Sequence, residues 1–511
     1  MPTPVMRPVM PAENGIPTFA MKLVRNSLWN IGGWIVALLI SFITTPIFIY
    51  FLGKDQYGLM ALLISISTPL ALLNLGIGEA TVKYMAENIG RKDYVQTGKY
   101  LRSTFLFNLS IGFLGGIVIM LLARFLITSV FNIPSDNQGM ARLCLYWIGI
   151  TWCVMQIRNT FTGVVMALQH YGILNIGNII TNLLTIAAGL GVLFLGGNLL
   201  DLIRIQAIVA AFMALGWLIL AQRLFPNISF FPRLDLLSFQ KTFGFGFWQM
   251  LNNMGGILGH QSERWLLGVL LPVSTVGFYN VGTQVVVIIY LAAYKIGEVL
   301  FPAVSQMQGQ LRDEEAARLV VQANWVITAF AMSCFVPLIV FAHDLLLLWI
   351  GLDFAINTSG LLRILAFGSA TSCLFAIPSF YLLGIGKSKW LALMSFAQGI
   401  ITLAVAALLI PRLGLAGAGW GATLSTVVHV IVLILMWKRI FRIWIPARVY
   451  FSATFGQYGV GGVVCTLISA STIALIDSVL PGGMERRKLL FRLGTARVPM
   501  LSRLLIGSYS R

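Results

Sequence analysis

Twelve long apolar runs, separated by short polar or glycine-containing turns, dominate this chain of 511 residues. A membrane-spanning helix needs about 20 apolar residues, and only helices or closed barrels satisfy their own backbone inside a bilayer. The runs lie at 28–52, 58–78, 103–127, 141–166, 174–196, 202–222, 243–271, 276–301, 319–342, 360–383, 390–410 and 415–437. Charged residues make up only 10% of the chain, whereas a soluble domain carries about 25%. The sequence therefore predicts an all-α polytopic membrane protein and excludes an ordinary soluble enzyme.

The basic residues predict the orientation of these spans. Cytoplasmic loops of membrane proteins carry an excess of Lys and Arg. With the N-terminus in the cytoplasm, nineteen basic residues fall on cytoplasmic segments. The opposite ends hold six, which are Lys54, Arg124, Arg142, Arg204, Arg363 and Arg412. We therefore expect a multi-pass protein of the inner (cytoplasmic) membrane, and the net charge of +18 needs no nucleic-acid partner to explain it.

Both ends of the chain are less regular than its middle. Residues 1–27 are expected to form a cytoplasmic segment before an uncleaved first span, with Met21 as an alternative start to Met1. Residues 438–511 form a basic segment that includes a glycine-rich run at 451–480, a candidate extra helix. If that run crosses the membrane, the basic tail after it lies outside, against the charge rule. Either the run does not cross fully or the end of the chain is atypical, and both alternatives stay open.

Matched turns indicate an internal repeat. The turn from Gly53 to Gly58 has the same spacing as the turn from Pro272 to Gly277. Two further pairs of turns, at Gln169 and Gly386 and at Gly196 and Pro411, are separated along the chain by nearly the same offset. Because six spans return the chain to the same side, the two copies run in parallel, and such repeats place their site between the halves. The predicted division is 28–225 and 243–437, two six-helix bundles joined by a cytoplasmic linker at 226–242.

Catalytic and metal-binding motifs are not found in the sequence. It contains no HExxH and no GxSxG, and Gly386-Lys387-Ser388 lacks the earlier glycine of a phosphate-binding loop. The five cysteines lie in apolar runs without CxxC spacing, so neither zinc nor a disulfide framework is indicated. We expect no cofactor and no enzymatic activity. The outer loops are too short for the catalytic domain of a polymerase or glycosyltransferase, and a purely structural subunit would not need charges at bilayer depth.

Two consecutive spans carry polar stripes. A charge at bilayer depth costs about 2.5–3.5 kcal/mol on insertion scales, so such residues need partners or water. The seventh span has seven polar or small residues on one face, namely Gln249, Asn252, Asn253, Gly256, His260, Glu263 and Arg264. The eighth has four, namely Asn280, Gln284, Lys295 and Glu298. The stripes predict either a hydrated cavity between the halves or a dry network between helices.

Several of these charges have simpler interpretations. Lys295 and Glu298 are spaced to pair on one helix. Glu263 and Arg264 are adjacent, and either they neutralise each other or they lie near the outer interface. Arg158 on the fourth span either takes part in transport or extends toward the interface. His170, His343 and His429 have no ligand-like neighbours in the sequence.

Short motifs along residues 22–440 together resemble the polysaccharide-biosynthesis membrane proteins. These are the O-antigen and exopolysaccharide flippases of the multidrug/oligosaccharidyl-lipid/polysaccharide exporter superfamily. The motifs are Asn30-Ile31-Gly32, Phe51-Leu52-Gly53, Tyr57-Gly58, Asn74-Leu75-Gly76, Ala86-Glu87, Glu263-Arg264, Val276-Gly277-Phe278-Tyr279 and Phe301-Pro302-Ala303-Val304-Ser305. The family often has Asp-Leu-Gly where this chain has Asn74-Leu75-Gly76, and that difference bears on ion coupling. The resemblance implies 12–14 transmembrane helices in two bundles, as in multidrug exporters, with spans one, two, seven and eight lining a central cavity.

The resemblance and the stripes together predict a flippase for a polyprenyl-pyrophosphate-linked oligosaccharide. We assign Arg264 and Lys295 to the pyrophosphate and Gln249, Asn252 and Asn253 to the sugar, with Arg158 as a further transport residue. Glu263, Glu298 and His260 are the candidates for coupling to a proton or sodium ion. The bilayer is the second partner, and contacts with a polysaccharide polymerase and glycosyltransferases are expected. The alternative is a multidrug or other lipid-precursor exporter of the same superfamily, which would favour acidic rather than basic residues in its cavity.

Overall fold

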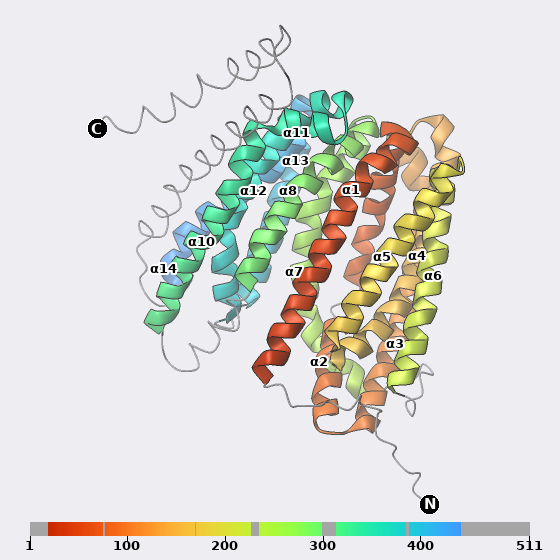
Figure 1. The fold of residues 1–511 in the computed structure, drawn as a ribbon, viewed down its shortest axis with the longest axis vertical. Coiled ribbons are helices and arrows are strands. Elements are labelled where there is room, and N and C mark those ends of the chain that lie inside the picture. Colours follow the sequence, from red (N-terminus) through yellow and green to blue (C-terminus); the bar gives the residue numbers. More distant parts are fainter. Residues whose placement is uncertain are drawn as a thin grey trace, which may run out of the picture.

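The computed structural model describes residues 19–74, 77–168, 170–225, 235–298, 313–384 and 388–440. Within these ranges the twelve apolar runs lie on helices, and the first run and most of the second share one long helix (Figure 1). The first half comprises α1 (Phe19–Ser67), η1 (Thr68–Asn74), α2 (Ile77–Gly90), α3 (Tyr94–Phe125), η2 (Leu126–Val130), α4 (Ser135–Ala167), α5 (Tyr171–Phe194) and α6 (Leu199–Leu224). The second half comprises α7 (Leu236–Leu270), α8 (Ser274–Glu298), α10 (Asp313–Val340), α11 (Ala342–Trp349), α12 (Leu352–Gly384), α13 (Ser388–Leu413) and α14 (Leu415–Ile440).

The first and second spans meet at a sharp turn. Gly53 has φ 71° and ψ 170° inside α1, so the chain reverses there and the segment 54–67 starts the second span, which continues through η1 and α2. A positive φ is readily adopted by glycine and costs other residues energy. We call the face of the bundle at this turn the Gly53 face. The opposite face, where α2 ends, is the Gly90 face.

Capping side chains and a short extra helix mark the ends of the spans. Asp93 caps α3 by accepting from the backbone N–H of Gln96 at 2.9 Å. Asn198 and Asp201 form a reciprocal capping box at the start of α6. Helix α1, which contains the first predicted span, begins at Phe19, and the short helix α11 at the Gly53 face was not predicted. The extra helix expected at 451–480, the basic tail and most of the linker 226–242 lie outside the described residues.

The packing of the two halves follows one pattern. In the first half α1 packs on α5, α3 on α4, and α4 on α6; in the second half α7 packs on α13, α10 on α12, and α12 on α14. The pairs α5–α6 and α13–α14 match as well. Between the halves, α1 contacts α8 and α2 contacts α7. A two-fold relation requires this pair of contacts, because α7 is the equivalent of α1 and α8 the equivalent of α2. This is the parallel repeat that the matched turns predicted.

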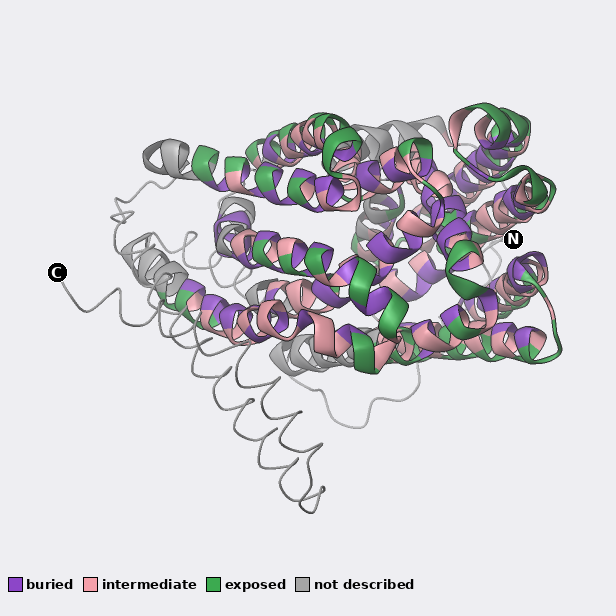
Figure 2. Ribbon diagram, turned by 90° about the horizontal axis from the view of Figure 1, so that it is seen from above, coloured by how far each residue is buried: buried purple, intermediate pink, exposed green. Residues whose placement is uncertain are grey.

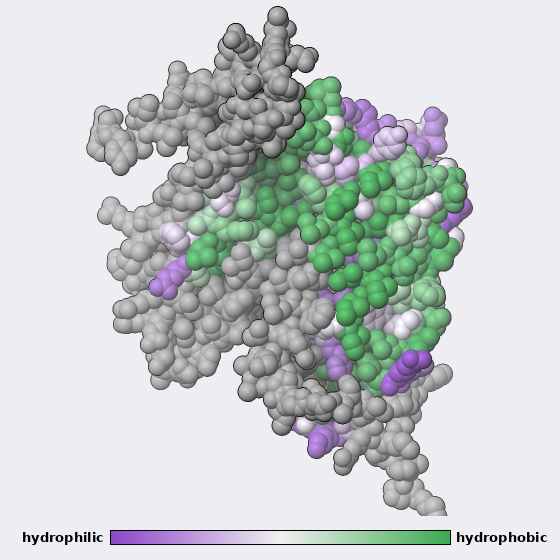
Figure 3. Space-filling model, viewed as in Figure 1, coloured by the Kyte–Doolittle hydropathy of each residue, from purple (hydrophilic) through white to green (hydrophobic). Residues whose placement is uncertain are grey.

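Polarity is distributed as a bilayer requires. Ten helical stretches among the described residues are long and apolar enough to cross a membrane. α7 is not one of them, because the polar residues of its stripe lower its hydropathy. On the face shown in Figure 3, a broad hydrophobic surface lies over the first half, with hydrophilic residues toward the two ends. Buried residues concentrate where helices face one another, as Figure 2 shows from above.

Candidate functional site

A cavity of about 470 Å³ lies inside the second half. Its walls come from five helices, α7, α8, α12, α13 and α14. Three residues of the predicted stripe line this cavity together, and all three lie within about one turn of α7; they are His260, Glu263 and Arg264. The His260 side chain is exposed to this space, while Glu263 is fully buried. The last three residues of the stripe therefore line a cavity, whereas Asn253 and Gly256 do not.

The position of this cavity differs from that of the predicted site. The sequence placed the site between the halves, with the first and second spans forming one wall. The residues lining this cavity belong instead to the second half alone. Near the Gly53 face the two halves pack closely, since a Cβ on Gly58 would stand 2.3 Å from the carbonyl oxygen of Val273, between α7 and α8.

The Arg264 guanidinium is held by four hydrogen bonds. Its Nη1 donates to the His260 carbonyl oxygen (3.0 Å) and to Gln261 Oε1 (2.9 Å). Its Nη2 donates to Asn280 Oδ1 and Thr283 Oγ1 on α8, both at 3.2 Å. The guanidinium also lies 5.9 Å from the ring centre of Tyr279. The stripe thus forms an interhelical network as well as a cavity wall, so both interpretations of its polarity apply.

Glu263 has far fewer partners than its neighbour. Its Oε2 accepts a long bond from Ser262 Oγ at 3.4 Å, and its Oε1 is buried with no hydrogen-bond partner. No ion pair joins Glu263 to Arg264, although both are among the described residues. Arg264 turns toward α8 instead, so its hydrogen bonds go to other groups than the Glu263 carboxyl. A buried carboxyl oxygen without a partner is energetically costly and marks this position as a candidate for binding a proton or cation.

Hydroxyl and amide groups complete the cavity. They come from α8, α12, α13 and α14, namely Thr283, Ser369, Ser372, Gln398, Thr423, Ser425, Thr426 and His429. The sequence did not predict these residues, and His429 has no ligand-like neighbours along the chain. The available signal was helical spacing, since Ser425 and His429 are four residues apart and Ser369 and Ser372 three. Distances between helices cannot be read from that spacing, so only the packing brings these groups to one space.

The remaining predicted residues lie elsewhere. Arg158 on α4 donates through Nη2 to Asn178 Oδ1 on α5, in the first half and away from the cavity. Asn253 lies on α7 but does not line the cavity. The backbones of Gln249 and Asn252 belong to α7 and those of Lys295 and Glu298 to α8. The side chains of these four residues lie outside what the structure describes.

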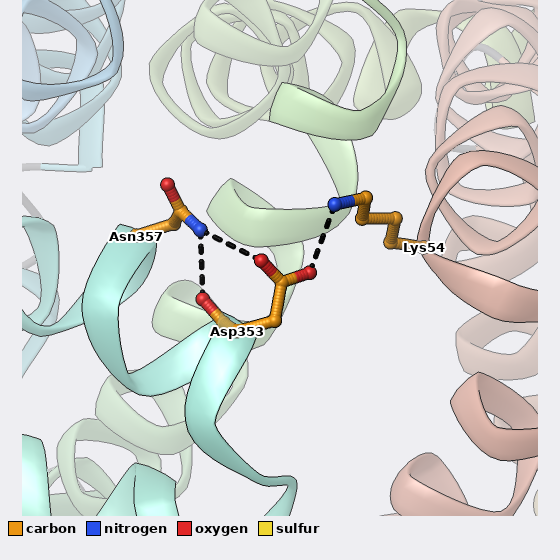
Figure 4. Close-up of polar contacts among 3 residues, drawn as sticks. All are labelled: Lys54, Asp353 and Asn357. Carbon is orange, nitrogen blue, oxygen red and sulfur yellow. Dashed lines mark hydrogen bonds and ion pairs between the residues drawn. The ribbon is translucent and has the colours of Figure 1, made fainter.

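The two halves are joined at the Gly53 face by polar contacts. Lys54 Nζ lies 3.0 Å from Asp353 Oδ2, and Asn357 donates to the backbone and side-chain oxygens of Asp353, so that Asp353 lies between them (Figure 4). The Asn132 backbone N–H donates to the Gly268 carbonyl oxygen at 2.8 Å. These contacts close the Gly53 face of the bundle.

Comparisons with known proteins agree on family and fold. Residues 23–308 match the model of a family described as "Polysaccharide biosynthesis protein". A curated "Putative O-antigen transporter" from Shigella flexneri is 19% identical over 439 residues, which are 83% of this chain and 100% of that protein. An inward-facing multidrug resistance transporter has a TM-score of 0.67 at 14% identity, over 81% of this chain and 94% of its own. The lipid II flippase MurJ in an inward closed conformation has a TM-score of 0.69 at 13% identity, over 96% and 100%.

Proposed function

The chain belongs to the polysaccharide biosynthesis protein family, and we propose that it is a flippase for a polyprenyl-pyrophosphate-linked oligosaccharide. The cargo would be an O-antigen or exopolysaccharide repeat unit, moved from the inner to the outer leaflet by alternating access. The observation that carries the proposal is the cavity of the second half, in which a guanidinium and two histidines lie among hydroxyl and amide groups. The similarity to an O-antigen transporter and to the fold of MurJ supports it.

The cavity chemistry matches the physical problem of moving this cargo. A pyrophosphate and a hydrated sugar are costly to place in hydrocarbon unless fixed charge and hydrogen-bonding groups replace their water. Arg264 supplies the positive charge, and the serines, threonines and Gln398 of the cavity supply donors and acceptors for sugar hydroxyls. The polyprenyl tail remains in the bilayer.

Helix geometry suggests that the two proposed pyrophosphate residues act in sequence. Lys295 lies twelve residues beyond Thr283, the partner of Arg264, on α8. At 1.5 Å per residue the two levels are about 18 Å apart along the helix, which is longer than one pyrophosphate. We propose that Lys295 meets the headgroup nearer the Gly90 face and Arg264 nearer the Gly53 face. Three residues precede Arg264 on α7 and so lie nearer the Gly90 face than Arg264 does; they are Gln249, Asn252 and Asn253. We propose that they contact the sugar.

Ion coupling is assigned to the carboxyl groups and the histidine of the stripes. Glu263, with its unpartnered oxygen, and His260, exposed to the cavity, are the proposed proton or sodium residues, together with Glu298 on α8. Arg158 is proposed as a transport contact of the first half. Transport of this kind needs no catalytic chemistry, and we propose no enzymatic activity.

One observation favours a second candidate, a multidrug or other lipid-precursor exporter. The buried Glu263 carboxyl is the kind of group that recognises a cationic drug. The Arg264 guanidinium beside it favours an anionic headgroup instead. Ethidium efflux by cells that express the protein would support the exporter, and export that depends on the lipid-linked sugar alone would support the flippase.

We place the protein in the inner membrane with its N-terminus in the cytoplasm, beside the polymerase and glycosyltransferases that use its cargo. Reporter fusions at Asn88, Arg312 and Arg442 should report cytoplasm, and fusions at Asn137 and Asn357 the outside. A cytoplasmic signal at Asn137 would reverse the orientation.

The decisive test of transport uses the purified protein in vesicles. A fluorescent polyprenyl-pyrophosphate oligosaccharide is placed in the inner leaflet, and its arrival outside is measured with an added glycosidase. We expect the sugar to reach the outside faster in vesicles that contain the protein than in vesicles without it. Equal rates in the two kinds of vesicle would refute the proposal.

The same assay separates two roles for Lys295. If it holds pyrophosphate, Lys295→Gln stops transport, Lys295→Arg is milder, and adding Glu298→Gln does not restore it. If it only neutralises Glu298, the double variant recovers transport, because no carboxylate is then left unpaired.

A further inference from the structure

Asn280 connects Arg264 to the opposite half of the molecule. Its Oδ1 accepts from Arg264 Nη2 at 3.2 Å, and its Nδ2 donates to the Tyr57 hydroxyl at 2.9 Å. Tyr57 belongs to the first half and is only 3% exposed. An amide can serve both partners only in one orientation, because a flip would turn its NH₂ group toward the guanidinium. The Tyr57 hydroxyl therefore helps to fix the amide that holds Arg264.

Tyr57 lies on the segment that closes the Gly53 face. It is three residues after Lys54, which pairs with Asp353, and directly before Gly58. Gly58 and Gly277 occupy equivalent positions of the repeat, and a Cβ on Gly277 would stand 3.2 Å from the Gly58 Cα. Residues that meet their own equivalents lie on the two-fold axis of a repeat. The segment that carries Tyr57 therefore cannot leave the second half without separating the halves at this face.

Arg264 offers little to an anion while this arrangement holds. Four of its five N–H donors are taken by His260, Gln261, Asn280 and Thr283, and only Nε, which is buried, has no partner. Thr283 lines the cavity and Gln261 does not, so an anion in the cavity reaches Nη2, where it must displace Asn280 or Thr283. Displacing Asn280 removes one of the two bonds that orient its amide, which weakens the bond to Tyr57.

We propose that Tyr57 and Asn280 couple occupancy of Arg264 by an anionic headgroup to opening of the Gly53 face. Binding at Arg264 releases Asn280 and with it one contact between the halves. By linkage, closing the face returns Asn280 to Arg264 and lowers the affinity for the anion by the same factor. Tyr57 is thus a positioning residue for the pyrophosphate site, although it does not line the cavity. This inference rests on the proposed function, since it takes Arg264 as the anion contact.

The test measures opening directly. Spin labels are placed at Gly139→Cys, at the exposed start of α4, and Leu352→Cys, which is 60% exposed at the start of α12. The native five cysteines are replaced by alanine. Distances are measured in nanodiscs with undecaprenyl pyrophosphate, and with undecaprenol as the control for the lipid tail. The pyrophosphate, and not the alcohol, should increase the fraction with the longer distance.

The variant Tyr57→Phe removes one hydroxyl and keeps the buried ring. The open fraction without ligand should rise about threefold to tenfold, the range for one hydrogen bond, and the added response to pyrophosphate should fall by the same factor. Tyr100→Phe, which removes a hydroxyl from another buried tyrosine of the first half, should respond like the native protein. Asn280→Ala should match Tyr57→Phe, and the double variant should add nothing, because both belong to one link.

The outcomes separate this inference from the proposed function. If the native protein opens in response to pyrophosphate and Tyr57→Phe retains that response in full, the coupling is overturned. The flippase proposal is not affected by that result. A native protein that transports the sugar lipid but does not open in response to pyrophosphate would also overturn only the coupling. Absence of transport in the vesicle assay would overturn the proposed function instead.

Discussion

The two halves share one packing pattern but differ in what their equivalent positions carry. At the chain offset that relates Pro272 to Gly53, His260, Glu263 and Arg264 of α7 correspond to Ser41, Thr44 and Thr45 of α1. Thr44 and Thr45 are buried, and their hydroxyls donate to helix carbonyls of Ile40 and Ser41 at 2.9 and 2.8 Å.

The consequence of this difference is physical. A small hydroxyl is satisfied by its own helix and can be packed closely. A guanidinium or carboxyl needs partners from other helices or access to water. The second half therefore retains a polar cavity at this level, whereas in the first half Thr44 and Thr45 are buried and the exposed Ser41 accepts a hydrogen bond from Gln284 Nε2 at 2.9 Å. A repeat can thus conserve its architecture while one copy takes on the polar chemistry.

The largest expected effect distinguishes the cations of the two halves. Arg264→Gln should lower transport by at least about tenfold, because it removes a charge worth roughly 1.5–3 kcal/mol in hydrogen bonding. Arg158→Gln should lower it by a smaller factor, about threefold, since Arg158 is proposed as a transport contact but is bonded to Asn178 away from the cavity. Initial transport rates in vesicles, at equal protein content, test this. Equal losses in both variants would mean that the first half takes part in headgroup binding as directly as the second.

The next prediction concerns the unpaired carboxyl. Glu263→Gln should abolish the dependence of transport on an imposed proton or sodium gradient, since the amide can neither release a proton nor balance a cation. Thr44→Val, at the equivalent position, should leave that dependence unchanged. Rates are compared with each gradient imposed separately. A gradient response that survives in Glu263→Gln would transfer the coupling role to His260 or Glu298.

A smaller effect should follow from the glycines on the two-fold axis. Gly58→Ala places a Cβ 2.3 Å from the Val273 carbonyl oxygen, whereas the Cβ of Gly277→Ala meets its nearest atoms at 3.2 Å. We expect Gly58→Ala to lower the free energy of unfolding by about 1–3 kcal/mol and Gly277→Ala by less. Thermal unfolding in detergent compares them. The opposite order would show that the halves are not in close contact at this face.

The smallest effect is expected at the Lys54–Asp353 ion pair. Its side chains are 46% and 52% exposed, so a double-mutant cycle with alanine should give a coupling of about 0.2–1 kcal/mol. High salt should reduce the coupling further, because exposed charges are screened. Thermal unfolding at low and high salt measures it. A salt-independent coupling of several kcal/mol would show that the pair is shielded from water in the membrane.

Local sequence signals were sufficient for the spans and for part of the site. The length and polarity of the apolar runs determine the helices, because backbone hydrogen bonds must be satisfied within each span. Gly53, which takes a positive φ, marks the turn between the first two spans. The spacing of His260, Glu263 and Arg264 placed them on one helical face, and the structure confirms that they share a cavity.

Tertiary structure alone decided which partners these residues meet. The sequence could not show that Arg264 turns to Asn280 and Thr283 rather than to Glu263, nor that Asn280 reaches Tyr57 in the other half of the chain. It could not bring His429 and Gln398 to the same cavity, because helical periodicity gives the direction of a side chain on its own helix but not the neighbouring helix it faces. The sequence by itself thus determined the class of protein, its spans and its repeat, since these depend on interactions within one segment. The cavity, the unpaired carboxyl and the link between the halves depend on packing between segments, and only the folded arrangement decides them.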